Sequence, residues 1–280
     1  MIIVDFNQVM ISNLMAQLGN HTNIPLDEGL FRHMVINSIR TYKQKFGDEY
    51  GEMVIACDDR NHWRKQMFPY YKANRKKNRD ASEIDWSLVF NSFDKIKQEL
   101  KDFFPYRVIQ VETAEADDII ATLVKNNPQA ELVLILSGDK DFIQLHRDGV
   151  KQYDPVRKKW ITHDNPVGYL YEHILKGDSG DGVPNVLSDD DVFVVDGKRQ
   201  KPLTQKKIDE IASTTIDSNH PLWRNWHRNY NLIDLQCIPQ NIKDQVFAKY
   251  SEQANKGRDK IFNYFITNKM KHLMEHVGEF

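Results

Sequence analysis

The stretch Leu132-Val133-Leu134-Ile135-Leu136-Ser137-Gly138-Asp139-Lys140-Asp141 shows the pattern that decides the fold. A short apolar run is followed directly by polar and acidic residues, which is typical of a buried parallel strand. Three more apolar runs, rich in β-branched residues, lie at 2–6, 53–57 and 106–111. Between them, 30–46 and 89–103 carry apolar residues at helical spacing. Strands that alternate with helices predict an α/β fold with a mostly parallel central sheet flanked by helices.

The strand signal becomes weaker after about residue 165. Segments at 168–176, 205–213 and 260–276 look helical instead. A chain of 280 residues is long enough for one large or two ordinary domains. The sequence therefore predicts a core over 1–165 and a mostly helical second domain over 166–280.

The composition excludes several classes of protein. A content of 40% hydrophobic and 11% aromatic residues is too high for a disordered chain. The two cysteines, Cys57 and Cys237, are far apart, which excludes a disulfide scaffold and a zinc-thiolate site. With no basic leader and no apolar run of about 18 residues, we expect a cytoplasmic protein that has no contact with membranes. The net charge of -2 means that any attraction to nucleic acid must be local.

Acidic residues follow the predicted strands. Asp5, Asp58 and Asp139 come at or just after the ends of three strands, and a fourth group at 112–118 opens a predicted helix. In an open α/β sheet, ligands bind beyond the carboxyl ends of the strands. Carboxylates about 4 Å apart repel by roughly 1 kcal/mol in water and about 4 kcal/mol at an effective dielectric near 20. A divalent cation with hard oxygen ligands, Mg²⁺ or Mn²⁺, would relieve this repulsion, and we favour Mg²⁺.

Each acid also has a structural interpretation. Asp5 taken alone fits a loop cap, and the three acids within 115–118 fit first-turn residues that complement a helix dipole. We assign Asp59 and Glu112 to solvent or structure. Metal binding is favoured for the set as a whole, because capping does not require separate segments to end in acid on the same side of one sheet.

The segment 60–79 has the opposite charge. It carries eight basic residues and no acid, and Trp63, Phe68, Tyr70 and Tyr71 are interleaved with them. Basic side chains together with rings on which bases stack are the combination expected in a groove for nucleic acid. For 75–79 alone, a solvated basic loop that balances the acidic edge is as good an interpretation. A cation site beside a basic segment is what hydrolysis of a nucleic-acid phosphodiester requires.

Together these motifs resemble the flap endonuclease or 5′-nuclease family, and within it most of all the T-even phage ribonuclease H type. The resemblance covers almost the whole chain. It rests on Val4-Asp5-Phe6-Asn7-Gln8, Cys57-Asp58, Trp63-Arg64, Tyr70-Tyr71-Lys72-Ala73-Asn74-Arg75, Glu115-Ala116-Asp117-Asp118, Ser137-Gly138-Asp139-Lys140-Asp141-Phe142 and Leu175-Lys176-Gly177-Asp178-Ser179-Gly180-Asp181. The fold it implies is a PIN-like nuclease core with a helical arch or clamp at about 60–90 and a C-terminal helical DNA-binding region.

The resemblance also implies the members of the site, which would hold two Mg²⁺ ions, with Mn²⁺ as a substitute. The ligands of the first metal would be Asp5, Asp58, Glu115, Asp117 and Asp139. Those of the second would be Asp141, Asp178 and Asp181, and an additional candidate ligand is Asp118. The scissile phosphate would be held by Arg64 and Lys72. Nucleic acid would be contacted by Trp63, Lys65, Tyr70, Tyr71, Arg75, Lys76, Lys77 and Arg79.

The activity implied is that of a magnesium-dependent 5′ to 3′ exonuclease and flap endonuclease. It would act on RNA–DNA and DNA duplexes with 5′ ends or flaps, by two-metal hydrolysis, and would remove RNA primers and adjacent DNA during lagging-strand replication. The resemblance also leads us to expect a monomer in the cytoplasm of a phage host, with a single-stranded-DNA-binding protein and a sliding clamp as partners.

One stretch departs from the family pattern. Many relatives follow the turn at 177–181 with a glycine-rich hairpin that grips duplex phosphates. Here Val183-Pro184-Asn185-Val186 leads into Ser188-Asp189-Asp190-Asp191 instead. An acidic run would repel DNA, so the usual hairpin is in question and we interpret the run as a solvated loop.

Two other functions remain open from the sequence. An aspartate-phosphoryl phosphatase would use Asp5 as its nucleophile, but it needs a second Asp two residues on, where Asn7 stands. A nonenzymatic module that binds branched DNA would have lost turnover, whereas the acidic set of this chain looks complete.

Overall fold

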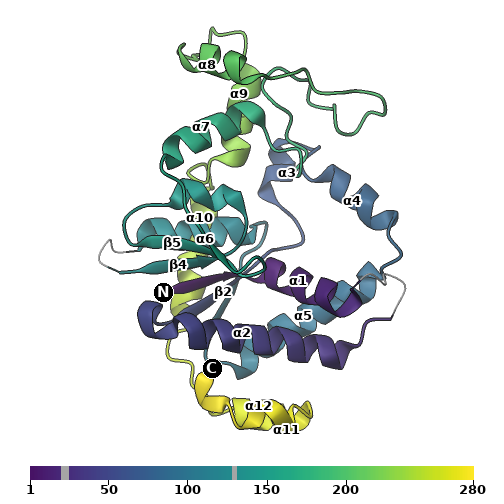
Figure 1. Cartoon of the computed structure of the whole chain (residues 1–280), viewed down its shortest axis with the longest axis vertical. Helices are drawn as coiled ribbons and strands as arrows, with labels where there is room; N and C mark the ends of the chain where they lie inside the picture. The colour runs from purple at the N-terminus through teal and green to yellow at the C-terminus, as the bar shows by residue number, and fades with distance from the viewer. Residues whose placement is uncertain (20–24, 128–130) are drawn as a thin grey trace.

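The computed structural model describes residues 1–19, 25–127 and 131–280, apart from the side chains of residues 76 and 78 (Figure 1). At its centre lies a six-stranded sheet with the order β3-β2-β1-β4-β5-β6. The strands are β1 (Ile2–Asp5), β2 (Met53–Cys57), β3 (Arg107–Gln110), β4 (Val133–Leu136), β5 (Val150–Asp154) and β6 (Lys159–Ile161). The strands from β1 to β5 pair in parallel and β6 pairs antiparallel with β5, which confirms the expected mostly parallel sheet.

Different helices cover the two faces of the sheet. Each strand contributes to both faces, because successive side chains point to opposite sides. On β1, Ile2 and Val4 join one hydrophobic cluster and Ile3 joins the other. The helices of the first cluster are α1 (Phe6–Leu18), α2 (Glu28–Tyr50), α5 (Trp86–Phe103), α11 (Ile261–Thr267) and α12 (Lys271–Met274). Those of the second are α6 (Ala116–Asn126), the 3-10 helix η1 (Lys140–Leu145) and α10 (Gln240–Glu252).

The remaining helices stand beyond the sheet, as Figure 1 shows. They are α3 (Trp63–Met67), α4 (Ala73–Asp80), α7 (Pro166–Lys176), α8 (Gln205–Ala212) and α9 (Trp223–Ile233). Phe68 and Tyr71, between α3 and α4, pack with Ile174 of α7 and Leu232 of α9. The basic segment is therefore anchored on helices that come more than 90 residues later in the chain.

Two regions differ from the sequence expectation. The strands β5 and β6 were not predicted, because Lys151 and Gln152 interrupt the apolar pattern of β5 and β6 is a three-residue edge strand. The helix expected at 260–276 is two short helices, α11 and α12, and Lys269 between them has a φ of 56°.

The change near residue 165 divides the hydrophobic core only in part, because Leu175, Val186, Ile208 and Ile211 form a separate cluster while other C-terminal residues pack on the sheet. Ile242 of α10 packs against one face of the sheet, and Phe265 of α11 belongs to the cluster on the other face. The C-terminal third of the chain therefore covers the sheet as well as standing above it. Within the described ranges, no helix is long and apolar enough to span a membrane.

Candidate active site

The carboxylates at the strand ends lie together. Asp5 ends β1, Asp58 follows β2, and Asp139 follows β4 after two residues. Because β1 lies between β2 and β4, their carboxyl ends are neighbours at one edge of the sheet. The N-terminus of α6, which lies at the same edge, contributes Glu115 and Asp117. The structure thus brings together the five residues expected to bind the first metal.

Hydrogen bonds fix the carboxylates that belong to the strands. Ser137 Oγ donates to Asp5 Oδ2 at 2.8 Å, and the backbone N–H of Ala116 donates to Asp58 Oδ1 at 2.6 Å. The amide of Asn7 donates to the other oxygen of Asp58. Asn7 was not among the site residues inferred from sequence, although it stands two residues after Asp5.

The second acidic group comes from η1 and from the turn after α7. Asp141 lies in the first turn of η1, and Asp178 and Asp181 lie just beyond Gly177, which ends α7. Gly177 has a φ of 67°, and a Cβ there would lie 2.4 Å from a backbone carbonyl oxygen, so the tight turn requires glycine. The N–H of Gly180 donates to Asp178 Oδ1 at 2.7 Å.

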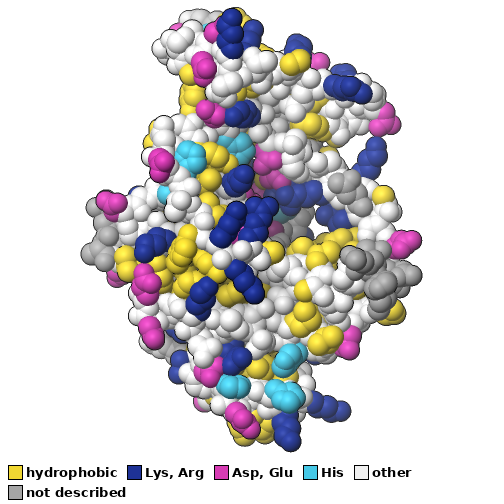
Figure 2. Space-filling model, viewed as in Figure 1, with side chains coloured by type: hydrophobic (Ala, Val, Ile, Leu, Met, Phe, Trp, Pro, Cys, Tyr) yellow, Lys and Arg dark blue, Asp and Glu magenta, His cyan; other side chains and the backbone are white. Residues whose placement is uncertain are grey.

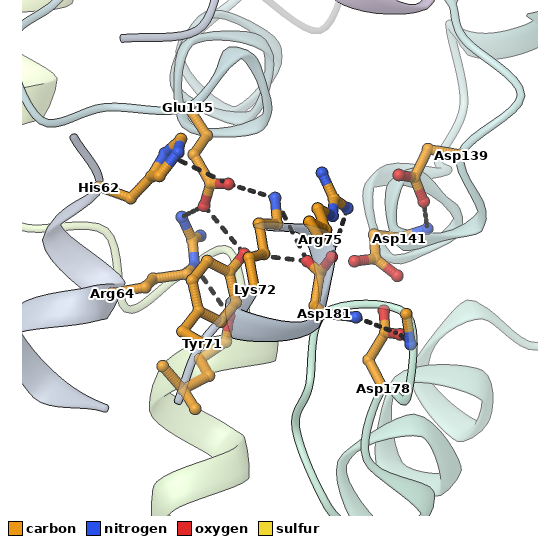
Figure 3. Close-up of polar contacts among 12 residues, drawn as sticks. His62, Arg64, Tyr71, Lys72, Arg75, Glu115, Asp139, Asp141, Asp178 and Asp181 are labelled. Atoms are coloured by element: carbon orange, nitrogen blue, oxygen red, sulfur yellow. Dashed lines mark hydrogen bonds and ion pairs between the residues drawn. The ribbon is translucent and has the colours of Figure 1, made fainter. Parts of the chain in front are cut away.

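These acids face an open cleft. A cleft of 480 Å³ is lined in part by Asp139, Asp141 and Asp178. Figure 2 shows Lys and Arg side chains gathered across this face of the molecule, around a recess with acidic side chains. In Figure 3, Glu115 and its partners lie on one side of the site and Asp139, Asp141 and Asp178 on the other, with Asp181 between them.

Crowding of carboxylates changes their protonation. Burial, reinforced by the charge of Asp58, raises the pKa of Asp5 to about 7. Burial and the neighbouring Asp139 raise the pKa of Asp117 and of Asp141 well above the usual range. In the described part of the chain, no Lys or Arg forms an ion pair with any of these five residues. An added divalent cation would supply the missing positive charge.

Lys72 lies between the two acidic groups. Its ammonium pairs with Glu115, and its Nζ lies 3.4 Å from Asp181 Oδ2. Arg75, on the first turn of α4, pairs with the other oxygen of Asp181. Burial opposes ionisation of Glu115, yet the charges of Lys72 and Arg64 lower its pKa to about 2. This position between the two acidic groups is compatible with the expectation that Lys72 holds the scissile phosphate.

Arg64 is buried and already paired. Its side chain is 3% exposed, its two terminal nitrogens lie 2.8 Å from Glu115 and from Asp118, and its Nε donates to the carbonyl oxygen of Leu232. Asp118 also accepts from Trp63 Nε1 at 3.0 Å. These contacts differ from the expectation that Arg64 holds the phosphate and that Asp118 binds metal, because both charges are already neutralised inside the protein.

The aromatic side chains of the basic segment divide into buried and exposed. Trp63 and Tyr71 are 6% and 4% exposed, so their rings are not open to a base. The hydroxyl of Tyr71 instead donates to Glu115 and to Asp181. Tyr70 is 38% exposed and remains a candidate for stacking. The expectation of base contacts from Trp63 and Tyr71 therefore does not fit their positions.

The outer basic residues differ in surroundings. Lys65 is exposed, and Lys77 lies 3.3 Å from Asp196 in an open ion pair. Arg79 lies over the ring of Phe90, with 5.8 Å between its Cζ and the ring centre. The side chain of Lys76 lies outside the described residues.

The acidic run after the turn is partly neutralised. Asp190 pairs with Arg224 and Arg228 of α9, and Asp191 lies 2.8 Å from Lys198. The run therefore repels a polyanion less than its sequence suggests, and Asp190 is fixed to α9 rather than solvated. Pairing across this distance in the chain leaves no trace in local sequence.

Two histidines of the site were missed by sequence reasoning. His62 Nδ1 lies 3.4 Å from Glu115, and His173 Nδ1 lies 3.4 Å from Asp141. Neither histidine has a spacing to other ligands that marks it. Only the expectation that residues 168–176 form a helix ending at the Asp178 turn could have drawn attention to His173.

This sheet, with its acid-lined edge and basic segment, is that of a class of nucleases, and the comparisons with known proteins agree. Residues 1–170 match the family described as 5′-3′ exonuclease, N-terminal resolvase-like domain. Residues 167–280 match the family described as T4 RNase H, C terminal. The chain belongs to the 5′-3′ exonuclease family and is a nuclease, an enzyme that hydrolyses phosphodiester bonds. The phosphatase and the nonenzymatic module find no support.

Individual relatives confirm the resemblance. Ribonuclease H of Enterobacteria phage T4 is 32% identical over 291 residues, covering 99% of this chain and 95% of the relative. Flap endonuclease Xni of Shewanella sp. (strain MR-4) is 31% identical over 142 residues, covering 48% of this chain and 51% of the relative. The solved structure of the T5 D15 protein with metal ions shares the fold, with a TM-score of 0.66 at 16% identity, covering 91% of this chain and 99% of that one.

Proposed function

We propose that this nuclease is a magnesium-dependent 5′ to 3′ exonuclease and flap endonuclease that acts on DNA and RNA–DNA duplexes. The observation that carries the proposal is the meeting of eight carboxylates from separate segments beside Lys72 and Arg75. The carboxylates are Asp5, Asp58, Glu115, Asp117, Asp139, Asp141, Asp178 and Asp181. Relatives support the substrate class, since one is named a ribonuclease H and another a flap endonuclease.

The donor set suits hard divalent cations. Carboxylate oxygens are the ligands that Mg²⁺ and Mn²⁺ prefer, and the raised pKa of Asp5, Asp117 and Asp141 indicates that the protein itself does little to stabilise their ionised forms. A structure of T5 5′-exonuclease is described with divalent zinc. We propose two cation positions, one at the strand-end acids and one near Asp141 and Asp178.

The protein's own residues would prepare the substrate phosphate for attack. Bound divalent ions lower the pKa of an attacking water and stabilise the oxygen that leaves. Lys72, held between Glu115 and Asp181, would neutralise charge on the phosphate oxygens in a partly dry site. Arg75 would approach the same phosphate from α4. Arg64 would act indirectly, because its ion pairs with Glu115 and Asp118 orient Glu115 and fix the position of the N-terminus of α6.

The direct test is a panel of labelled 5′-flap, nicked and RNA–DNA substrates, with Mg²⁺ or with chelator. We expect cleavage from the 5′ end that requires Mg²⁺ and yields products with a 5′-phosphate. Asp139→Asn should lower the cleavage rate by more than ~100-fold, because even the loss of a residue that only hydrogen-bonds to a metal ligand costs up to ~100-fold. The affinity for DNA should be unchanged or improved. Asp48→Asn, at an exposed position of α2, is the matched control. Full activity of Asp139→Asn would refute the ligand assignment.

We further propose a role in the removal of RNA primers and adjacent DNA during lagging-strand replication, by a monomer in the cytoplasm of a phage host. A single-stranded-DNA-binding protein and a sliding clamp are the partners to test, by their effect on the length of product released in each encounter. Sedimentation of the purified chain tests the monomer.

A further inference from the structure

One end of the site contains a nitrogen donor among its carboxylates. His173 lies in the last turn of α7, four residues after Tyr169 and directly before the turn that carries Asp178. Its Nδ1 lies 3.4 Å from Asp141 Oδ1, and its Nε2 lies 3.9 Å from Asp178 Oδ2. One ligand atom from each of the three residues can be chosen so that all lie within 4.8 Å of one another.

The ring of His173 has an unsatisfied nitrogen. Its side chain is 15% exposed, and among the residues that the structure describes no group forms a hydrogen bond with its buried Nδ1. A buried nitrogen without a partner costs free energy unless something else binds it.

The geometry is that of a small cation site. A cation about 2.2 Å from each donor has its donors about 3 to 4 Å apart, and one ligand atom from each of these three side chains lies within 4.8 Å of the other two. The C-terminal end of α7 adds the partial negative charge of its last carbonyl groups. The ring nitrogen that does not bind the cation would lie near an oxygen of Asp141 or Asp178, and such a carboxylate contact orients metal-binding histidines in general.

We propose that His173 supplies a nitrogen ligand to a cation held by Asp141 and Asp178, so that this position prefers a transition-metal ion such as Mn²⁺ over Mg²⁺. The inference rests on the second cation position of the proposed function. Mg²⁺ favours oxygen ligands, whereas imidazole is a common ligand of the first-row transition metals, a series in which Mn²⁺ binds nitrogen most weakly and the later ions more strongly. The two cation positions of the site would then differ in metal preference, because the acids at the strand ends offer oxygen.

The test is pulsed electron paramagnetic resonance of Mn²⁺ bound to the intact chain, which detects a ¹⁴N nucleus coordinated to the ion. We expect nitrogen coupling in the wild type, its loss in His173→Phe, and its retention in His163→Phe, a control at an exposed histidine near Tyr169. His62→Phe is included because His62 lies beside Glu115. Absence of coupling in the wild type, or coupling that is lost only in His62→Phe, would overturn the inference.

Calorimetry of metal binding gives a second measurement. His173→Phe should weaken the tighter Mn²⁺ site by ~10- to 100-fold while Mg²⁺ binding changes far less. His173→Gln keeps an oxygen donor, so it should lose the nitrogen coupling but retain Mg²⁺ binding, which also guards against a folding defect of the Phe variant. Equal losses for both metals in both variants would instead make His173 a residue that only positions Asp141.

These outcomes separate the inference from the function on which it rests. Cleavage with Mg²⁺ but no nitrogen coupling to bound Mn²⁺ would remove only the role of His173. Nitrogen coupling without cleavage under either metal would leave the cation site in place and remove the proposed nuclease specificity.

Discussion

The Glu115 end and the Asp141 end of the site are both acidic, but they solve the problem of buried charge differently. Glu115 is surrounded by Arg64, Lys72 and the hydroxyl of Tyr71, and its pKa is lowered to about 2. Asp141 faces other carboxylates and His173, and its pKa is raised well above the usual range. The protein therefore compensates the first end itself, and the second is the end for which we propose an added cation.

The largest effect should come from breaking the compensated end. Arg64→Met removes the cation paired with buried Asp118 and one of the two cations paired with Glu115, and we expect a loss of about 3–5 kcal/mol in the free energy of unfolding. Arg75→Met removes a half-exposed pair with Asp181 and should cost less than about 1 kcal/mol. Urea unfolding of both variants measures the difference. Equal losses would show that burial of Arg64 has no special weight.

Neutralising one carboxylate at each end should have opposite effects in chelator. Glu115→Gln weakens the bonds with Arg64 and Lys72 and should destabilise the fold by about 1–3 kcal/mol. Asp141→Asn removes repulsion and should stabilise it by about 1 kcal/mol. With Mg²⁺ present, the wild type should regain its advantage over Asp141→Asn, because a bound ligand stabilises the native state. The same sign for both variants in chelator would contradict the comparison.

The pH dependence should differ in the same way. The pKa of Asp5 is raised from 3.8 to about 7, so the native state holds this proton more tightly than the unfolded state. Its contribution to stability is full below about pH 4 and is lost as pH rises towards 7. The contribution of Glu115 is present above pH 4.5 and lost as pH falls towards 2. Thermal unfolding in chelator should show the first slope, and Asp5→Asn should remove it.

The smallest effect concerns the outer basic residues. Arg75→Ala and Lys77→Ala should each reduce the salt dependence of DNA binding by about one unit, if each side chain contacts one phosphate. Lys271→Ala, on α12 at the lower end of the molecule in Figure 1 and away from α4, is the control. If Lys77→Ala leaves the salt dependence of DNA binding unchanged, Lys77 contacts no phosphate and only forms its exposed ion pair with Asp196.

The sequence was sufficient for the sheet and for the acids at its edge. Central strands buried on both faces are continuous apolar runs, so 2–6, 53–57 and 132–136 were recognisable, and the residues after them had to lie at one edge. The strand β5 was not recognisable, because Gln152 is a buried polar residue that bonds to two backbone carbonyl groups. Its partners belong to the loop after β4, which local sequence does not reveal.

The role of each residue in the site was harder to predict from the sequence than which residues lie near the site. Asp117 and Asp118 are adjacent on α6, where successive side chains are rotated by about 100° about the helix axis. Asp117 therefore lies towards the other acids, and Asp118 lies towards Arg64 and Trp63. A basic, aromatic segment likewise does not tell which of its rings face inward, and Trp63 and Tyr71 do. These outcomes depend on packing against α9 and α6, which are distant in sequence.

The carbonyl oxygen of Asp181 accepts a bond of 2.7 Å from the N–H of Lys72, which has a left-handed φ of 55°, while the carboxylate of the same residue meets Tyr71, Lys72 and Arg75. One short turn therefore belongs both to the acidic edge, where we propose a cation, and to the start of the basic segment. If a nucleic-acid strand bound to α4 changes the affinity of this edge for a cation, thermodynamic reciprocity requires that the cation change the affinity for the strand by the same factor.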